Sequence, residues 1–287
     1  MPELAYVNGT FSKLSEATVS IQDRGFQFAD GVYEVVIAFG ERIFRLAEHL
    51  ERLRRSLEGI RLPIEHCGVD FEAMIREGIR RARFESTLVY VQVTRGACPR
   101  AQVAIDPGPP TVVATFTERK PLDRELRARG LSVCTTEDIR WARCAVKSTA
   151  LLPNVLAKTE ALDAGYDDAI FLAPDGEVRE ATAANVFVAH QGQLRTPPKS
   201  DHILHGVTRS YVLECAGRIG VPAREASIMG DELREADEVF LCSTTLDIAA
   251  VCRVDDRPIG LGTPGPLTNA LHDEFCARLR DEVLDDE

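Results

Sequence analysis

Lysine is scarce in this sequence, so the residues that could supply a nucleophilic amine are few. Only five of the 34 basic residues are lysines, and four of them fall in loops or on an amphipathic helix. Lys147 differs, because Ala145-Val146 precede it and Ser148-Thr149-Ala150 follow it. A lysine must be neutral to attack a carbonyl, and apolar surroundings favour the neutral amine. The alternative is a lysine at a strand end with its ammonium in water, and the local sequence leaves both interpretations open.

The hydrophobic pattern predicts a mixed α+β chain in two parts. Alternating or β-rich runs predict strands at 31–39, 42–46, 89–93, 111–117, 131–135, 168–173, 185–189 and 238–242. Apolar residues at helical spacing predict helices at 46–60, 71–82, 151–164, 208–219 and 267–283. Asn8-Gly9 predicts a hairpin turn. A charged stretch with a proline predicts a linker at 119–124, between domains at 1–118 and 125–287.

Composition narrows the classes of partner. The net charge of −11 argues against nucleic acid, which needs a basic footprint. The sequence contains no apolar run long enough to span a bilayer and no signal pattern at its start, so we expect a cytoplasmic protein without a membrane partner. The eight cysteines show no spacing typical of a metal site and are expected to be reduced thiols.

Eight segments, taken in order, resemble one enzyme family. They are Asp23 to Val35; Glu48-His49 with Arg52; Gln92 to Gly96 with Pro99-Arg100; Asp138 to Trp141 leading into Val146-Lys147-Ser148; Leu156 to Lys158; Glu180 to Phe187; Ile203 to Arg209; and Ser243 to Thr245. Their order and approximate spacing, over nearly the whole chain, resemble the D-amino-acid transaminases. These belong to the fold-type IV enzymes, which use pyridoxal 5′-phosphate (PLP).

The resemblance implies a fold, a cofactor and a reaction. The fold is α+β, with a small N-terminal α/β domain and a larger PLP-binding C-terminal domain whose core is β-barrel-like. The implied enzyme is a homodimer with PLP in the cleft between the domains. It would transfer the amino group of a D-amino acid to a 2-oxo acid such as 2-oxoglutarate or pyruvate.

The resemblance also implies a set of cofactor-binding residues. Lys147 would form the Schiff base with PLP and then carry the proton, while Glu180 would keep the ring nitrogen protonated. Val207 and Thr208 also begin a predicted helix, where free backbone N–H groups favour a phosphate. The full predicted set is Arg52, Arg140, Lys147, Glu180, Leu204, Val207, Thr208 and Thr244.

Three residues are implied to bind the substrate carboxylate: Tyr33, Arg100 and Gln102. An arginine fork binds a carboxylate through two hydrogen bonds, which suits an amino acid. The resemblance implies that Arg100 and Gln102 face the active site of the neighbouring subunit. The family usually has histidine where this chain has Gln102, and a neutral amide offers no positive charge.

Other activities of the same enzyme group remain as alternatives. Tyr33-Glu34-Val35 differs from the patterns of branched-chain aminotransferases and aminodeoxychorismate lyases, and it is closer to that of (R)-selective amine transaminases. Arg100 favours an amino-acid substrate over a simple amine. A PLP-binding protein without catalytic activity is the alternative from a different class.

Overall fold

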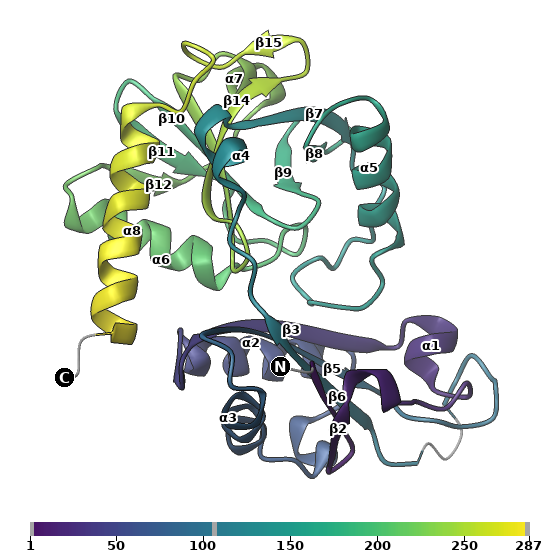
Figure 1. Cartoon of the computed structure of the whole chain (residues 1–287). Helices are drawn as coiled ribbons and strands as arrows, with labels where there is room; N and C mark the ends of the chain where they lie inside the picture. The colour runs from purple at the N-terminus through teal and green to yellow at the C-terminus, as the bar shows by residue number, and fades with distance from the viewer. Residues whose placement is uncertain (1–2, 105–107, 285–287) are drawn as a thin grey trace. The chain divides into compact units, whose positions relative to one another are not determined.

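The computed structural model describes residues 3–104 and 108–284, and it forms two compact units (Figure 1). Unit 1 contains the described residues of Met1–Lys120, the segment Val146–Ala150 and the described residues from Glu282 to Leu284. Unit 2 contains Pro121–Ala145 and Leu151–Asp281. The predicted domain limits at residues 1 and 287 lie outside the described residues. Val146–Ala150 includes Lys147, so the lysine belongs to unit 1 although the sequence on either side belongs to unit 2.

Unit 1 is built on an antiparallel sheet of six described strands in the order β2-β1-β6-β5-β3-β4. The strands are β1 (Leu4–Val7), β2 (Thr10–Lys13), β3 (Gly31–Phe39), β4 (Arg42–Ile43), β5 (Ser86–Thr94) and β6 (Thr111–Glu118). Between β1 and β2 the chain turns at Asn8 and Gly9, whose φ angles of 45° and 94° are left-handed. The predicted Asn-Gly hairpin is therefore present.

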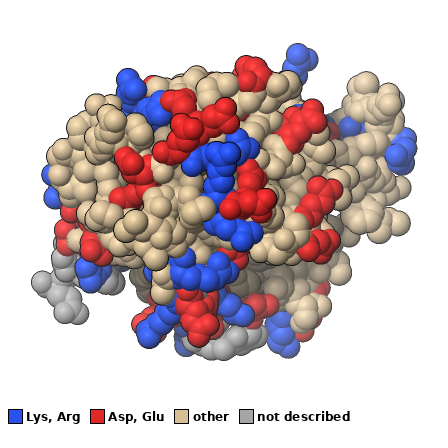
Figure 2. Space-filling view, turned by 90° about the horizontal axis from the view of Figure 1, so that it is seen from above, with Lys and Arg blue, Asp and Glu red and all other residues tan. Residues whose placement is uncertain are grey.

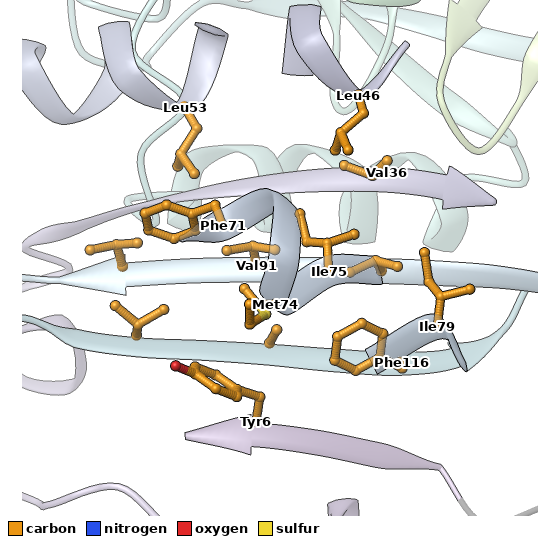
Figure 3. Close-up of a cluster of buried hydrophobic side chains, with 14 of the residues drawn as sticks. Tyr6, Val36, Leu46, Leu53, Phe71, Met74, Ile75, Ile79, Val91 and Phe116 are labelled. Carbon is orange, nitrogen blue, oxygen red and sulfur yellow. The ribbon is translucent and has the colours of Figure 1, made fainter. Parts of the chain in front are cut away.

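Two helices cover one face of this sheet. The helices of unit 1 are α1 (Arg24–Phe28), α2 (Leu46–Gly59) and α3 (Phe71–Ala82), with 3-10 turns at Leu14–Glu16 and Ile64–Cys67. Figure 3 shows Leu53 of α2 and Ile75 of α3 in the same apolar cluster as Phe116 of β6. Gly78 lets α3 approach closely, because a Cβ there would lie 1.9 Å from Cζ of Phe116.

The opposite face of the sheet is only partly covered. Strand side chains alternate between faces, so Tyr33 and Val35 of β3 point away from the helices, as do Tyr90 and Gln92 of β5. All four side chains are half-buried. This face therefore carries aromatic and polar side chains that do not pack in the core.

Unit 2 contains a nine-stranded sheet in its described part, with the main order β12-β11-β10-β13-β14-β7-β8-β9 and β15 paired to β14. The strands are β7 (Leu131–Glu137), β8 (Asp168–Leu172), β9 (Val178–Ala181), β10 (Asn185–His190), β11 (Gln193–Thr196), β12 (Ala223–Glu225), β13 (Glu238–Ser243), β14 (Asp247–Val254) and β15 (Arg257–Pro258). Glu180 lies on β9, the last strand in this order, and Asn185 lies on β10, a central strand of the same sheet.

This sheet must curl. Strands β9 and β10 are separated along the sheet by five strand spacings, about 24 Å if the sheet were flat. The chain from Ala181 to Asn185 can span about 14 Å at most. The ends of β9 and β10 therefore meet only if the sheet bends into a barrel-like form, and the backbone N–H of Ala181 indeed donates to Ala184 across this turn.

Five helices begin in unit 2: α4 (Arg124–Arg129), α5 (Leu152–Asp163), α6 (Val207–Arg218), α7 (Gly230–Arg234) and α8 (Pro266–Leu284). None of the helices in the described residues is long and apolar enough to cross a membrane. On the face seen in Figure 2, basic and acidic side chains lie next to one another. Such mixing leaves no single-sign field on that face to attract a polyanion.

Candidate functional site

The predicted site residues form two groups, one in each unit. Unit 1 holds Tyr33, Arg52, Arg100, Gln102 and Lys147. Unit 2 holds Arg140, Glu180, Leu204, Val207, Thr208 and Thr244. The residues of each group come from distant segments of the sequence. The fold of each unit must therefore bring its own group together.

The backbone of Lys147 is held on both sides. Its N–H donates to Oγ of Ser56 on α2 at 3.1 Å, and its carbonyl accepts from the N–H of Tyr33 on β3 at 2.9 Å. The next residue, Ser148, forms an antiparallel bridge with Val32. The lysine is thus fixed at its backbone by a helix and a strand of unit 1, while its side chain is left half-buried.

The amine of Lys147 lies over an aromatic ring. Its Nζ is 4.3 Å from the centroid of Tyr33, whose ring stacks on Tyr90 with centroids 5.5 Å apart. The hydroxyl of Tyr90 donates to Oε1 of Gln92 at 2.7 Å, and burial raises the pKa of Tyr90 to about 12. Tyr90 therefore stays a neutral phenol at ordinary pH. Tyr90 and Gln92 were not predicted as site residues, although they occupy alternate positions of a predicted strand that pairs with the strand of Tyr33.

Arg52 lies in a buried cluster with Glu34 and His49. Its Nε and Nη2 donate to the two carboxylate oxygens of Glu34, at 2.9 and 2.6 Å, and Nδ1 of His49 lies 3.1 Å from Oε1. The three side chains are almost inaccessible to solvent. Burial alone raises the pKa of Glu34, but the charge of Arg52 and the contact with His49 outweigh it and hold that pKa far below its usual range.

The pKa of His49 is lowered, chiefly by burial, so this imidazole is neutral at ordinary pH. Its Nδ1 faces the Glu34 carboxylate and must carry the ring proton, because a carboxylate oxygen accepts. Glu34 and His49 were missed as site residues by sequence reasoning. A charged residue at an alternating, inward position of an apolar strand was the available signal for Glu34. The phosphate contact expected of Arg52 stays a prediction.

Arg100 and Gln102 lie in the loop after β5, and both side chains are exposed. The guanidinium carbon of Arg100 is 4.8 Å from the ring centroid of Phe28 at the end of α1. Stacking on an aromatic face restrains an arginine while leaving its outer N–H groups available to a ligand. The loop therefore displays one restrained cation and one amide two residues apart.

In unit 2, Glu180 is the centre of a buried polar cluster. Its carboxylate accepts from Nη1 of Arg140 at 2.5 Å, from the N–H of Leu204 at 3.0 Å and from Nδ2 of Asn185 at 3.2 Å. Arg140 also binds Asp138. Burial opposes the charge of Arg140, but its contacts with Asp138 and Glu180 prevail and raise its pKa. The arrangement surrounds the carboxylate of Glu180, a residue that is only 6% exposed, with hydrogen-bond donors from Arg140, Leu204 and Asn185.

The start of α6 is suited to an anion. Its N-cap residue, Gly206, provides no side-chain hydrogen bond to the helix, and Val207 and Thr208 at its first turn are buried. A Cβ at Gly206 would lie 2.1 Å from Oδ1 of Asn185, so only glycine allows this close approach. Backbone N–H groups of a first helical turn and the hydroxyl of Thr208 form a donor set typical of phosphate sites. Thr244 lies half-buried in the turn between β13 and β14.

Within residues 3–104 and 108–284, no group of three or more His, Cys, Asp or Glu side chains is arranged to hold a metal ion.

Comparison with known proteins points to one family. Residues 31–254 match the model of the family described as amino-transferase class IV. The chain is 39% identical over 262 residues to a D-alanine aminotransferase of Bacillus licheniformis, covering 91% of this chain and 92% of that protein. It is 33% identical to a D-alanine aminotransferase of Staphylococcus haemolyticus, covering 94% and 95% of the two chains.

Solved structures share the fold. A branched-chain amino acid aminotransferase of T.th., determined with pyridoxamine 5′-phosphate, is 28% identical and superimposes with a TM-score of 0.89 over 99% of this chain and 95% of that one. The branched-chain aminotransferase of Escherichia coli is 23% identical, with a TM-score of 0.87 over 100% and 97% of the chains. These likenesses confirm the predicted two-domain α+β fold of type IV.

Replacing Glu34 by glutamine should strongly destabilise the protein. The change removes the charge that Glu34 places against the buried guanidinium of Arg52, and breaking a buried ion pair costs about 3 kcal/mol or more of unfolding free energy. Because the folded-state pKa of Glu34 is depressed, its stabilisation is present above the ordinary carboxyl pKa and is lost as the pH falls toward the folded value. The difference from the wild type, measured by chemical denaturation, should therefore be largest near neutral pH and shrink in acid.

The matched control is Glu51→Gln on α2, the helix that carries Arg52. Glu51 pairs with Arg54 at the surface, with both side chains exposed, so its loss should change the stability little at any pH. An equal effect of the two substitutions would contradict the role of the buried pair.

Proposed function

The chain belongs to the class IV aminotransferases, which depend on PLP, and we propose that it transfers the amino group of D-amino acids to 2-oxo acids. An amino donor and a 2-oxo acid acceptor are the substrates of any aminotransferase. The D-amino-acid class is supported by the relatives, because the D-alanine aminotransferases are 33–39% identical over nearly the whole chain. The branched-chain enzymes with the same fold are more distant at 23–28%.

The observation that carries the choice of an amino acid over a simple amine is the exposed guanidinium of Arg100. A donor that bears a carboxylate gains a charge-assisted pair from it, whereas a simple amine gains nothing. Arg100 stacks on Phe28, so part of its conformational freedom is already lost before a ligand binds. Tyr33 supplies a hydroxyl for the same carboxylate, and Gln102 supplies an amide donor where the family usually has histidine.

The residues present fit PLP in their chemistry. The first turn of α6 and Thr208 would bind the phosphate, and the carboxylate of Glu180 would keep a ring nitrogen protonated. When bound, the cofactor supplies an aldehyde carbon for the amino group and a pyridinium ring that accepts the electron pair left at Cα. Lys147 would hold the cofactor covalently and remove the proton from Cα of the donor. Arg140 orients Glu180 through its hydrogen bond.

We also propose that the enzyme is a homodimer in which Arg100 and Gln102 face the neighbouring active site. Large apolar side chains are exposed in this loop, at Val103 (75%), and in the segment paired with it, at Ile21 (79%) and Phe26 (74%). The segments that carry these side chains are paired, since the N–H of Cys98 donates to the carbonyl of Gln22. Apolar groups gathered around a functional loop are suited to burial by a second copy of the chain.

The donor preference tests the proposed function directly. Purified enzyme with its cofactor should be mixed in turn with D-alanine, L-leucine and (R)-1-phenylethylamine, while the absorption of the cofactor is followed. D-Alanine should convert the cofactor at least about tenfold faster than either alternative. Faster conversion by L-leucine would identify a branched-chain enzyme, and faster conversion by the amine would identify an amine transaminase.

Chemical trapping tests the lysine. Borohydride reduction followed by peptide mapping should place the pyridoxyl group on Lys147, and Lys147→Ala should lower turnover by about 10³-fold or more. Lys158→Ala is the matched control, because this lysine pairs with Asp168 at 3.0 Å and is expected to leave the labelling of Lys147 and most of the turnover intact. Label on Lys158 in the wild type would refute the assignment.

Mixed dimers test the sharing of Arg100 between subunits. Arg100→Ala and Lys147→Ala are each expected to be nearly inactive toward D-alanine. If Arg100 acts in the partner's site, a hybrid of the two variants contains one intact site, and random mixing should restore about a quarter of the wild-type activity. If both residues act in the same subunit, each hybrid site carries one defect and no activity returns.

A further inference from the structure

We propose that Arg24 is a positioning residue for substrate recognition, because its side chain holds the backbone of the loop that displays Arg100 and Gln102. This inference rests on the proposed function, in which that loop binds the carboxylate of the donor. Arg24 belongs to the Asp23-Arg24-Gly25 motif, to which the sequence analysis assigned no individual role.

The guanidinium of Arg24 binds the loop directly. Nη1 donates to the carbonyl of Ala101 at 2.6 Å, and Nη2 donates to the carbonyl of Gln102 at 2.9 Å. These are the two carbonyl groups that follow Arg100 in the chain. Arg24 is 5% exposed, whereas Arg100 and Gln102 are exposed. One buried cation therefore fixes the peptide groups of a loop whose functional side chains remain available to a ligand.

The same contacts reduce the repulsion between the carbonyl groups of the loop and a substrate carboxylate. A carbonyl oxygen carries partial negative charge and repels a carboxylate that approaches it. Arg24 binds both oxygens, so their negative ends face the buried guanidinium. The carboxylate of a donor would then meet the side chains of Arg100 and Gln102 without competing acceptors from these two peptide groups.

Arg24 is itself held by Asp30. Its Nε donates to Oδ2 of Asp30 at 2.7 Å, and Asp30 also accepts from Nε and Nη2 of Arg95. Arg95 in turn donates to the carbonyl of Ile60 at 2.6 Å, just beyond the end of α2. Arg24 and Arg95 thus share the carboxylate of Asp30 but differ in their other contacts, since Arg24 binds the loop and Arg95 binds the end of α2.

The surrounding residues allow Arg24 to reach this position. Asp23 caps α1 by accepting from the N–H of Gly25 and also accepts from the hydroxyl of Thr94 at 2.8 Å. A Cβ at Gly25 would lie 2.2 Å from Cγ2 of Thr94, so the tight packing of α1 on β5 requires glycine. The ring of Phe28 lies 4.8 Å from the guanidinium carbons of both Arg24 and Arg100, which places the two arginines on one aromatic side chain.

A comparison of Arg24→Met with Arg95→Met tests the proposal. Both changes remove a guanidinium that binds Asp30, but only Arg24 contacts the loop. Hydrogen exchange followed by mass spectrometry should show that residues 97–104 of the holoenzyme exchange about tenfold faster in Arg24→Met and at the wild-type rate in Arg95→Met. Arg24→Lys should give an intermediate rate, because an ammonium can bind one carbonyl but lacks the fork that binds two.

The kinetic readout separates positioning from general damage. In Arg24→Met the KM for D-alanine should rise about tenfold or more with little change in kcat, because a misplaced carboxylate partner weakens ground and transition states alike. Arg95→Met should leave the KM within about twofold of the wild type. If Arg24→Met does not fold, Arg24→Lys is compared with Arg95→Met in its place, with an expected rise of severalfold in KM.

The outcomes are distinguishable. Unchanged exchange of residues 97–104 on loss of Arg24 would overturn the positioning role, as would an equal effect of the two methionine variants. A wild-type enzyme that does not react with D-alanine would refute the proposed function, and the exchange rates would still decide whether Arg24 holds the loop.

Discussion

The backbone pairing between the lysine segment and the first residues of β3 is the constraint on which the site in unit 1 depends. Tyr33 donates its N–H to the carbonyl of Lys147, and Thr149 donates to the carbonyl of Gly31. Strand side chains alternate, so this pairing directs Tyr33 toward the lysine and Glu34 into the core. A slip of one residue would exchange these directions, placing a carboxylate beside the amine and a phenol in the core.

The buried charge of Glu34 then limits the positions that α2 can take along the sheet. The leucines of α2 recur along one face, and apolar contacts alone would tolerate a shift by one turn. Only one register brings both Arg52 and His49 to the carboxylate of Glu34. A buried ion pair adds little net stability compared with apolar packing, yet it strongly penalises arrangements that separate the charges. The pair therefore fixes α2, and with it Ser56, the residue that binds the N–H of Lys147.

Features set by residues close together in the sequence were predicted well, whereas contacts between residues far apart in the sequence were not. The spacing of apolar residues predicted α3 at its observed bounds and α2 to within one residue, because helical periodicity is local. Strand β14 was missed, since Asp247–Val254 contains two alanines and does not alternate. Arg52 was predicted to bind the cofactor, but its ion pair with Glu34 was not foreseen, because the two side chains come from a helix and a strand. The contacts of Lys147 with Ser56 and of Arg24 with Gln102 join residues 91 and 78 positions apart, and no local pattern encodes them.

The geometry of these contacts explains why arginines hold other groups in place while a lysine provides the reactive amine. Arg24 binds two carbonyls and a carboxylate, and Arg140 binds two carboxylates, each with a single planar group. A guanidinium keeps its charge at any ordinary pH and presents several donors in fixed directions, whereas an ammonium is a single point of charge that can also lose its proton and react. Lysine in these positions would hold the partners less well and would add amines able to attack a carbonyl compound. Lys147 has the opposite environment, with its backbone fixed and its amine resting on the face of Tyr33. The rigid cations thus position the loop and the carboxylates, and the amine of Lys147, placed over an aromatic ring, keeps the freedom to exchange partners and protons that transamination requires.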